Sequence, residues 1–240
     1  MKKIFVMLVL AAAFSASARS QTLRIGNTEI EMGKKDSLRV NPDEASFTAD
    51  FKPYIHVLPY VSASFPIRTG NGLMPATYWQ SYNLDIGFRF LYRAVRRWSV
   101  GGTIRASVYS YETDGLAAGG QITGNPVTGD LKAERLIYGP VGLEFNNRIH
   151  LTPKINFDLS LYGEYGQLSF YTKTTGTDGS KVISNWSDSS IMNRWQAGVQ
   201  FSFMWSYLSV YARYRITDMF RKDFAMDEPS RLFVGLAFEF

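Results

Sequence analysis

Few side chains of this 240-residue chain suit acid–base catalysis, since only two are histidines, His56 and His150. A histidine is the usual general base near neutral pH, and it activates a serine when a third group orients it. Neither histidine has an obvious partner in the sequence, and the acidic pair Asp227-Glu228 lies in a predicted loop. We therefore expect no catalytic residues and a protein that is not an enzyme.

Sites for metals and cofactors are equally poorly supported. The chain has no cysteine, which excludes a disulfide scaffold and thiolate ligands. Asp188 is flanked by hydroxyl side chains rather than carboxylates, and no stretch has the spacing of a calcium loop. Gly119-Gly120 lies within a predicted loop, so these glycines indicate a turn rather than a phosphate cradle. We expect no metal and no cofactor.

In several segments, charged side chains recur at alternate positions, and the positions between them are apolar. In a strand, alternate residues face opposite sides of the sheet. If the sheet closes into a narrow barrel, these charges point into its lumen, where each needs an opposite charge or water. The predicted lumen charge network holds six arginines and five acids: Asp85, Arg89, Arg105, Glu144, Asp158, Glu164, Arg194, Arg213, Arg215, Arg231 and Glu239.

The elements that must position these charges are strands. One segment alternates Leu84, Ile86 and Phe88 with Asp85 and Arg89, and others repeat the pattern. About ten alternating residues form the repeat unit of a transmembrane β-barrel. We predict eight strands, at about 51–65, 80–93, 98–112, 133–149, 155–172, 191–205, 207–217 and 231–240.

The predicted connections alternate in length. Those after the second, fourth and sixth strands are short, whereas residues 66–79, 113–132, 173–190 and 217–230 form longer ones. Outer-membrane barrels have tight periplasmic turns and longer external loops. We therefore predict an all-β, antiparallel, up-and-down transmembrane barrel with both termini in the periplasm. A ten-stranded barrel that uses residues 22–40 as an extra hairpin is the structural alternative.

The first 50 residues differ from the rest of the chain. Residues 1–20 combine Lys2-Lys3 with a short apolar run and small residues at 16–20, as secretory signal peptides do. Residues 21–50 are charged and weakly alternating, so we expect a periplasmic extension before a barrel domain at 51–240. The formal net charge of +5 falls to roughly +2 without the leader, too little to favour nucleic-acid binding.

The last strand carries the strongest resemblance to a known family. Leu236, Phe238 and the final Phe240 share an apolar parity, which resembles the C-terminal assembly signal of outer-membrane β-barrels. With the leader, the eight strands and the loop asymmetry, residues 51–240 resemble the small outer-membrane β-barrel family, of the eight-stranded outer-membrane protein A and X type. The resemblance implies export to the outer membrane of a Gram-negative-type envelope, contact with lipopolysaccharide, and insertion by the barrel-assembly machinery.

The family does not imply one activity, because barrels of this type serve as anchors, adhesins, narrow pores and enzymes. We expect a non-catalytic barrel with a side-chain-plugged interior and a structural or surface-interaction role. A narrow porin-like channel, a lipid- or peptide-modifying enzyme and a soluble secreted β-sandwich are the alternatives. The loops and residues 21–50 are the candidate surfaces for an unidentified ligand or periplasmic partner. We expect the aromatic residues near strand ends to lie at the membrane interfaces: Trp98, Trp195 and Trp205.

Overall fold

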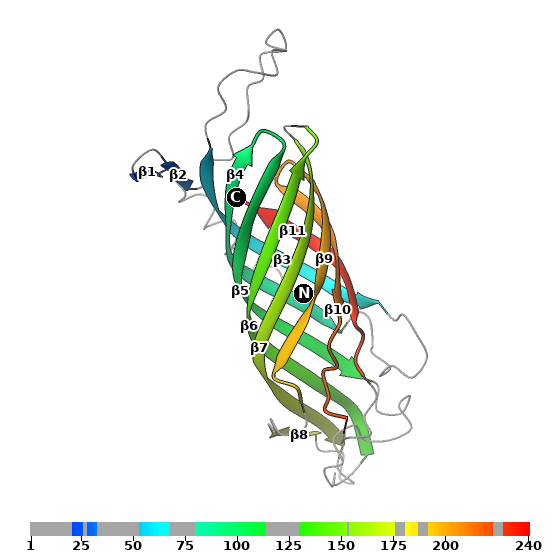
Figure 1. The fold of residues 1–240 in the computed structure, drawn as a ribbon. Coiled ribbons are helices and arrows are strands. Elements are labelled where there is room, and N and C mark those ends of the chain that lie inside the picture. Colours follow the sequence, from blue (N-terminus) through cyan, green and yellow to red (C-terminus); the bar gives the residue numbers. More distant parts are fainter. Residues whose placement is uncertain are drawn as a thin grey trace.

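The described part of the chain is built from strands that wrap into a barrel, without a helix among them (Figure 1). The structure is a computed structural model, and it describes residues 21–25, 28–32, 53–67, 80–113, 130–152, 154–175, 181–186, 192–222 and 228–240. Its strands are β1 (Gln21–Ile25), β2 (Thr28–Met32), β3 (Tyr54–Ile67), β4 (Tyr82–Val95), β5 (Trp98–Thr113), β6 (Asp130–His150), β7 (Ile155–Thr175), β8 (Lys181–Trp186), β9 (Trp195–Trp205), β10 (Leu208–Arg215) and β11 (Leu232–Glu239).

Eight of these strands close a single antiparallel ring. Neighbours in the ring pair in the order β3, β4, β5, β6, β7, β9, β10 and β11. The ring closes where β11 pairs with β3, for example Phe238 opposite Val61. The predicted eight-stranded, antiparallel, all-β barrel is confirmed. Closure leaves no free sheet edge along the paired length of the ring.

The N-terminal hairpin is not part of this ring, so the ten-stranded alternative is wrong. β1 pairs with β2, and β2 runs parallel to the start of β3 at only three positions, with Glu31 opposite His56 at the middle one. Those positions lie beyond the end of β11, whose last paired residue, Glu239, is opposite Tyr60. The hairpin therefore occupies the part of β3 that β11 is too short to reach. The predicted signal peptide at 1–20 lies outside the described residues.

One strand occurs where a loop was predicted. β8 lies within the predicted connection 173–190 and pairs with the end of β7, from Phe170 opposite Trp186 to Thr175 opposite Lys181. β6 and β7 have 21 residues each, so this pair extends past the shorter strands of the ring. The missed strand has too few residues for a clear alternating pattern.

The two ends of the barrel differ in their connections. Arg96-Arg97, residues 151–154 and Ser206-Tyr207 join strands at one end, called the turn end. Ser206 has a φ of 60°, as tight two-residue hairpin turns require. The longer connections lie at the opposite end, called the loop end. The chain finishes at the turn end, where the Phe240 amide donates to the Pro59 carbonyl over 3.2 Å. Within the described ranges, no helix has the length and hydropathy needed to cross a membrane.

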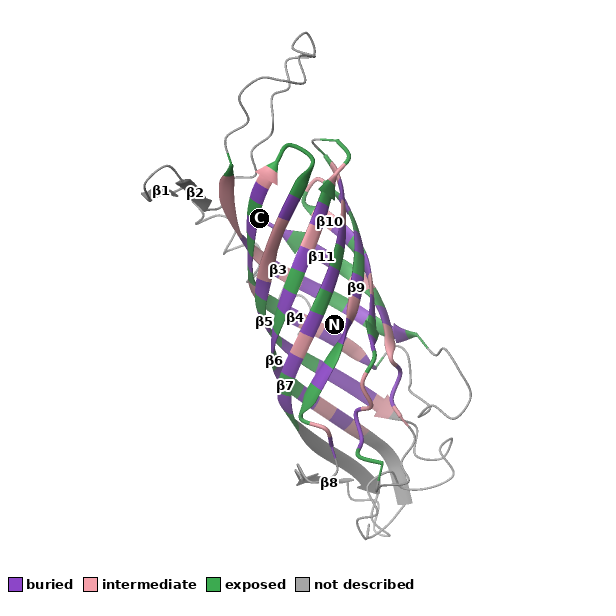
Figure 2. Ribbon diagram, in the orientation of Figure 1, coloured by how far each residue is buried: buried purple, intermediate pink, exposed green. Residues whose placement is uncertain are grey.

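Burial alternates along every ring strand, as Figure 2 shows by its purple and green stripes. In β9, for example, Trp195, Phe201 and Trp205 are exposed, whereas Gln196 and Gln200 are buried. β-Branched and aromatic residues favour this pleated geometry. The barrel interior thus holds most of the charged side chains, and the outer surface is largely apolar.

Candidate functional site: the barrel surface and its closed interior

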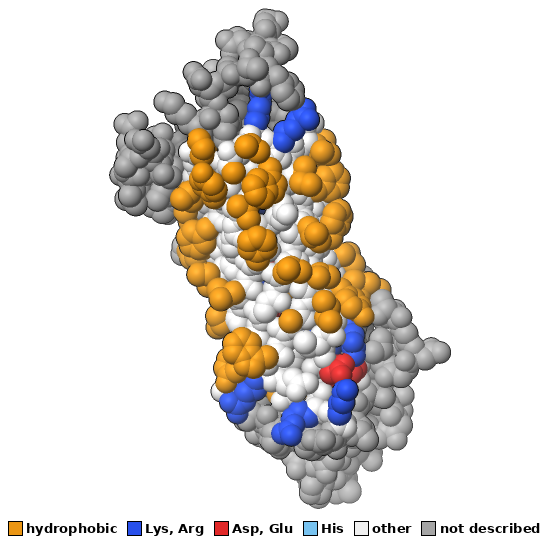
Figure 3. Space-filling view, in the orientation of Figure 1, with side chains coloured by type: hydrophobic (Ala, Val, Ile, Leu, Met, Phe, Trp, Pro, Cys, Tyr) orange, Lys and Arg blue, Asp and Glu red, His pale blue; other side chains and the backbone are white. Residues whose placement is uncertain are grey.

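A broad apolar surface surrounds the barrel. Figure 3 shows hydrophobic side chains over its middle, with lysine and arginine towards both ends. Monomeric soluble proteins rarely expose continuous apolar patches above a few hundred square ångströms. Among the large apolar side chains exposed on the strands are Ile86, Phe88, Ile104, Val141, Leu143, Phe145, Leu159, Leu161, Phe201, Val210, Leu236 and Phe238.

The three tryptophans predicted to lie at interfaces are exposed at strand ends. Trp98 begins β5 and Trp205 ends β9, both at the turn end, while Trp195 begins β9 at the loop end. Trp98 donates its indole N–H to Asn147 Oδ1 over 2.7 Å. Such rings have an apolar body and a polar tip, which suits a boundary between apolar and aqueous surroundings.

The interior near the turn end contains a dense ion cluster, here called the lower network. Arg148 Nε and Nη2 each donate to Asp158 over 2.6 Å, and Nη2 also reaches Glu239 Oε1 over 2.8 Å. Arg89 contacts both of these carboxylates and donates from Nη2 to Glu144 over 3.2 Å. All five side chains are at most 3% exposed.

A second cluster, the middle network, follows towards the loop end. Arg213 Nη2 donates to Asp85 Oδ2 over 2.9 Å, and Arg105 forms an ion pair with Glu164. Arg105 Nη1 also lies 3.6 Å from Glu144 Oε2, so Glu144 links the two networks. Because these residues come from different strands, the networks connect opposite walls of the barrel.

Two of the buried arginines also lie over tyrosine rings, in cation–π contact. The guanidinium of Arg89 lies 4.9 Å from the ring centre of Tyr60, and that of Arg105 lies 5.0 Å from the ring of Tyr162. Cations over aromatic faces gain about 2 kcal/mol or more when desolvated. Across the two networks, four arginines face five carboxylates, and near-balance of this kind is what a buried ionic interior needs.

The loop end is closed differently, by a segment of chain folded over the mouth, here called the lid (residues 216–222 and 228–230). Met219 and Phe220 are at most 3% exposed, and Asn193 donates its amide to the Met219 carbonyl over 2.9 Å. Glu228 accepts the amides of Met219 over 3.0 Å and Phe220 over 2.9 Å. It also accepts from Arg215 Nη2 over 3.1 Å.

Beneath the lid lies an apolar cluster rather than an ionic one. Tyr109 packs edge-on against Phe233 with ring centres 5.4 Å apart, and Tyr111 packs edge-on against the same ring at 5.8 Å. The buried members are Tyr109, Tyr111, Leu136, Tyr138, Met192, Met219, Phe220 and Phe233. The lumen is therefore obstructed at three levels: two networks and this cluster.

Nine of the eleven charges predicted for the lumen lie inside it: Asp85, Arg89, Arg105, Glu144, Asp158, Glu164, Arg213, Arg215 and Glu239. The prediction was wrong for Arg194 and Arg231. Arg194 is exposed and donates to the Tyr165 hydroxyl over 3.2 Å, and Arg231 is partly exposed and pairs with Asp218. Each precedes the first residue of its strand, so the inward alternation does not extend to it.

Sequence reasoning missed Arg148, a central member of the lower network. It has the same parity as Glu144 on β6, and that parity would have been sufficient to identify it. Asp158 lies opposite Arg148 on the neighbouring strand β7, but Glu239 lies on β11, which only the closed ring brings near.

His150 has two hydrogen-bond partners that were not apparent from the sequence. Its Nε2 lies 2.6 Å from Ser99 Oγ, and its Nδ1 lies 2.7 Å from Asn156 Oδ1. A serine, a histidine and an orienting amide in this order form the geometry of an activated nucleophile. Ser99 is only 1% exposed, however, so a substrate carbonyl has no access to its hydroxyl.

The second histidine, His56, lies at the same end of the barrel. His56 packs edge-on against Tyr54, with ring centres 4.5 Å apart, on the first turn-end residues of β3. Among the described residues, no group of three His, Cys, Asp or Glu side chains is placed to hold a metal ion. No protein-family model matches the chain, and a search of curated proteins finds no similar sequence.

Proposed function

We propose that this protein is an integral outer-membrane β-barrel with a plugged, non-catalytic interior and a role in envelope structure or surface interaction. The observation that carries the proposal is the inverted distribution of polarity. A closed eight-stranded ring has an apolar outer surface and buries its charges inside. Backbone hydrogen bonds are satisfied around such a ring, as a lipid environment requires.

The plugged interior is supported by three successive obstructions. Eight-stranded barrels are narrow enough for side chains to fill. Here Arg89 and Arg148 connect β4 and β6 to the carboxylates of β7 and β11, and Arg105 and Arg213 bind carboxylates of β7 and β4. The apolar cluster beneath the lid follows towards the loop end. This arrangement leaves the loops and the N-terminal extension as the candidate surfaces for a ligand or partner.

Export and assembly complete the proposal. Residues 1–20 serve as the signal peptide, and both termini lie in the periplasm, at the turn end. Leu236 and Phe238 face outward on β11, and Phe240 follows at the end of that strand. This terminal strand would be recognised by the barrel-assembly machinery, and the apolar surface would contact lipid and lipopolysaccharide.

Membrane insertion tests the proposal directly. Leu143 is 65% exposed near the middle of β6, and Leu143→Arg places a charge on the proposed lipid face. Such a charge costs about 2–4 kcal/mol at the bilayer midplane and about 0–1 kcal/mol near an interface. We expect the wild-type chain to remain in carbonate-washed membranes, and Leu143→Arg to reduce insertion strongly.

Val95→Arg is the matched control, because Val95 is similarly exposed but lies at the turn-end rim. It should insert like the wild type. Recovery of the wild-type protein in the aqueous fraction, or equal insertion of all three chains, would contradict the proposal and favour a soluble secreted β-protein.

A narrow pore is the second candidate, and one observation favours it. Asn83 is buried on the inner wall of β4, and neither its Oδ1 nor its Nδ2 has a hydrogen-bond partner in the described part of the protein. Such groups are normally satisfied by ordered water. Water bound at this point of the wall would mark a route for small solutes if the networks rearranged.

A further inference from the structure

Arg215 has a guanidinium that the protein satisfies only in part. Its Nη2 donates to Glu228 over 3.1 Å and to the Pro229 carbonyl over 3.0 Å. Its Nε and Nη1 are buried and have no hydrogen-bond partner, although the residue is only 5% exposed. Leaving buried donors unpaired costs about 1–3 kcal/mol each, and more for a charged group. A bound species that accepts these N–H groups would remove that cost.

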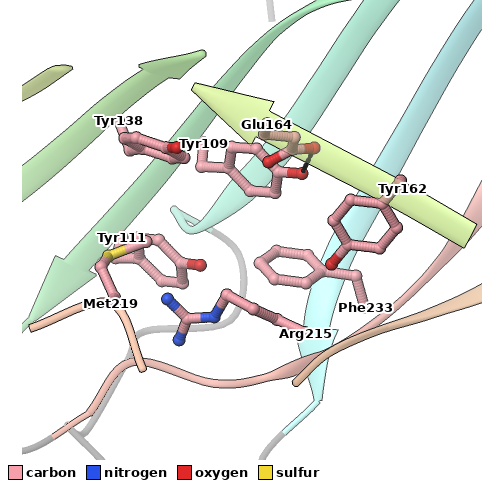
Figure 4. A pocket seen from close by; sticks show the side chains of 8 residues that line it. All are labelled: Tyr109, Tyr111, Tyr138, Tyr162, Glu164, Arg215, Met219 and Phe233. Atoms are coloured by element: carbon pink, nitrogen blue, oxygen red, sulfur yellow. Dashed lines mark hydrogen bonds between the residues drawn. The ribbon is translucent and has the colours of Figure 1, made fainter. Parts of the chain in front are cut away.

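Arg215 is one of the residues that line a small cavity beneath the lid. Its lining comprises Tyr109, Tyr111, Tyr138, Tyr162, Glu164, Arg215, Met219 and Phe233, as Figure 4 shows. The space holds roughly one water-sized particle. An occupant must therefore be monatomic or nearly so.

The acidic groups nearby are already engaged. Glu164 accepts a hydrogen bond from the Tyr109 hydroxyl over 2.7 Å and forms an ion pair with Arg105. Glu228 is bound by the two lid amides as well as by Arg215. Backbone amides thus stabilise the Glu228 carboxylate independently of the guanidinium. Arg215 thus has one carboxylate partner, through Nη2, and two donors without a partner among the described residues of the protein.

We propose that this cavity is a site for a small monovalent anion of halide size, with chloride as the natural occupant. Arginine offers only donors, so the occupant must accept hydrogen bonds. The rest of the lining is mainly aromatic and Met219, and aromatic ring edges carry partial positive charge. A weakly hydrated halide loses less on entering such surroundings than a strongly hydrated oxyanion, for which the space is also too small. Water in place of the halide is the competing occupant.

Bromide provides the direct test, because it can be located by anomalous scattering. Crystals of the full chain, purified in detergent, would be grown with chloride and soaked in bromide. The site predicts an anomalous peak within hydrogen-bond distance of Arg215 Nε or Nη1. Density for water alone at that position, with bromide bound only at the molecular surface, would overturn the proposal.

Thermal unfolding gives a second, independent test. Ligands that bind only the folded state raise Tm as their concentration exceeds Kd. We expect the Tm of the wild type to rise when chloride replaces gluconate at constant ionic strength, since gluconate is too large for the cavity. Arg215→Gln should lose this increment.

Arg194→Gln is the matched control, because Arg194 is an exposed arginine at the same end. It should retain the full chloride-dependent increment. An equal increment in Arg215→Gln and the wild type would overturn the site. If Arg215→Gln does not fold, the bromide peak in wild-type crystals still decides the question.

Discussion

The two halves of the barrel interior are closed by different means. Towards the turn end, Arg89 and Arg148 bind Asp158 and Glu239 directly, so closure depends on charges that neutralise one another. At the loop end, aromatic and methionine side chains fill the mouth. The Glu228 carboxylate accepts two amides of the lid above them.

This difference separates a rigid region from one that can open. Each arginine of the lower network has several carboxylate partners on different strands. Moving any one of these side chains would leave a buried charge with fewer partners, which costs free energy. The lid instead depends mostly on hydrogen bonds and apolar packing. Glu228 accepts three of these bonds, and Asn193 and Gln196 donate others to lid carbonyls. We infer that local opening begins at the loop end, where less free energy opposes it.

The largest expected effect comes from breaking the lower network. Arg89→Met keeps much of the side-chain volume but removes the ion pairs to Glu144, Asp158 and Glu239. Loss of one partner in a buried ionic cluster costs about 3–5 kcal/mol. We expect a decrease of that size in the free energy of unfolding, measured by denaturant titration of the barrel in lipid vesicles.

Arg135→Met is the matched control for this experiment. Arg135 pairs with Glu112 at the loop end, and its side chain is 39% exposed. Exposed ion pairs contribute about 0–1 kcal/mol, so this variant should unfold almost like the wild type. Equal losses in both variants would show that the lower network is no more important than a surface pair.

A smaller, local effect is expected from releasing the lid. Glu228→Gln preserves the shape of the side chain but removes its charge from Arg215 and the two amides. Hydrogen bonds to charged groups contribute about 1.5–3 kcal/mol. Hydrogen exchange at the Met219 and Phe220 amides should therefore accelerate by one to two orders of magnitude.

Glu112→Gln provides the comparison, because Glu112 lies at the same end but does not contact the lid. Exchange of the two amides should stay at the wild-type rate in that variant. Unchanged exchange in Glu228→Gln would show that the other hydrogen bonds of the lid and its apolar packing suffice to hold it closed.

The smallest effect is expected at the turn-end histidine. Ser99→Ala removes one hydrogen bond to His150, worth about 0.5–1.5 kcal/mol. Because the Ser99 hydroxyl is buried, a fluorophosphonate probe should not label the folded wild-type protein. Labelling that disappears in Ser99→Ala would contradict the non-catalytic account and identify Ser99 as a nucleophile.

The strands were predictable because their pattern is local. Alternation placed Asp85 and Arg89 inside and Ile86 and Phe88 outside before any pairing was known. The interior contacts were not predictable in this way. Arg89 and Glu239 are 150 positions apart, and only the closed ring brings them together.

The errors arose at strand ends and in loops. Arg194 and Arg231 each lie one residue before a strand, where periodicity does not define the boundary. Glu228 was correctly placed in a loop but was interpreted as solvated. Its role in holding the lid depends on the fold of a connection that has no repeating pattern.

Single-channel conductance in a planar bilayer tests the plugged interior most directly. The wild-type barrel would be compared with Arg213→Ala, which weakens the middle network, after insertion of both is verified by protease protection. The account predicts no current above background from the inserted wild type, because three obstructions close its lumen. A steady, ion-selective wild-type current that changes in Arg213→Ala would contradict it and identify the protein as a pore.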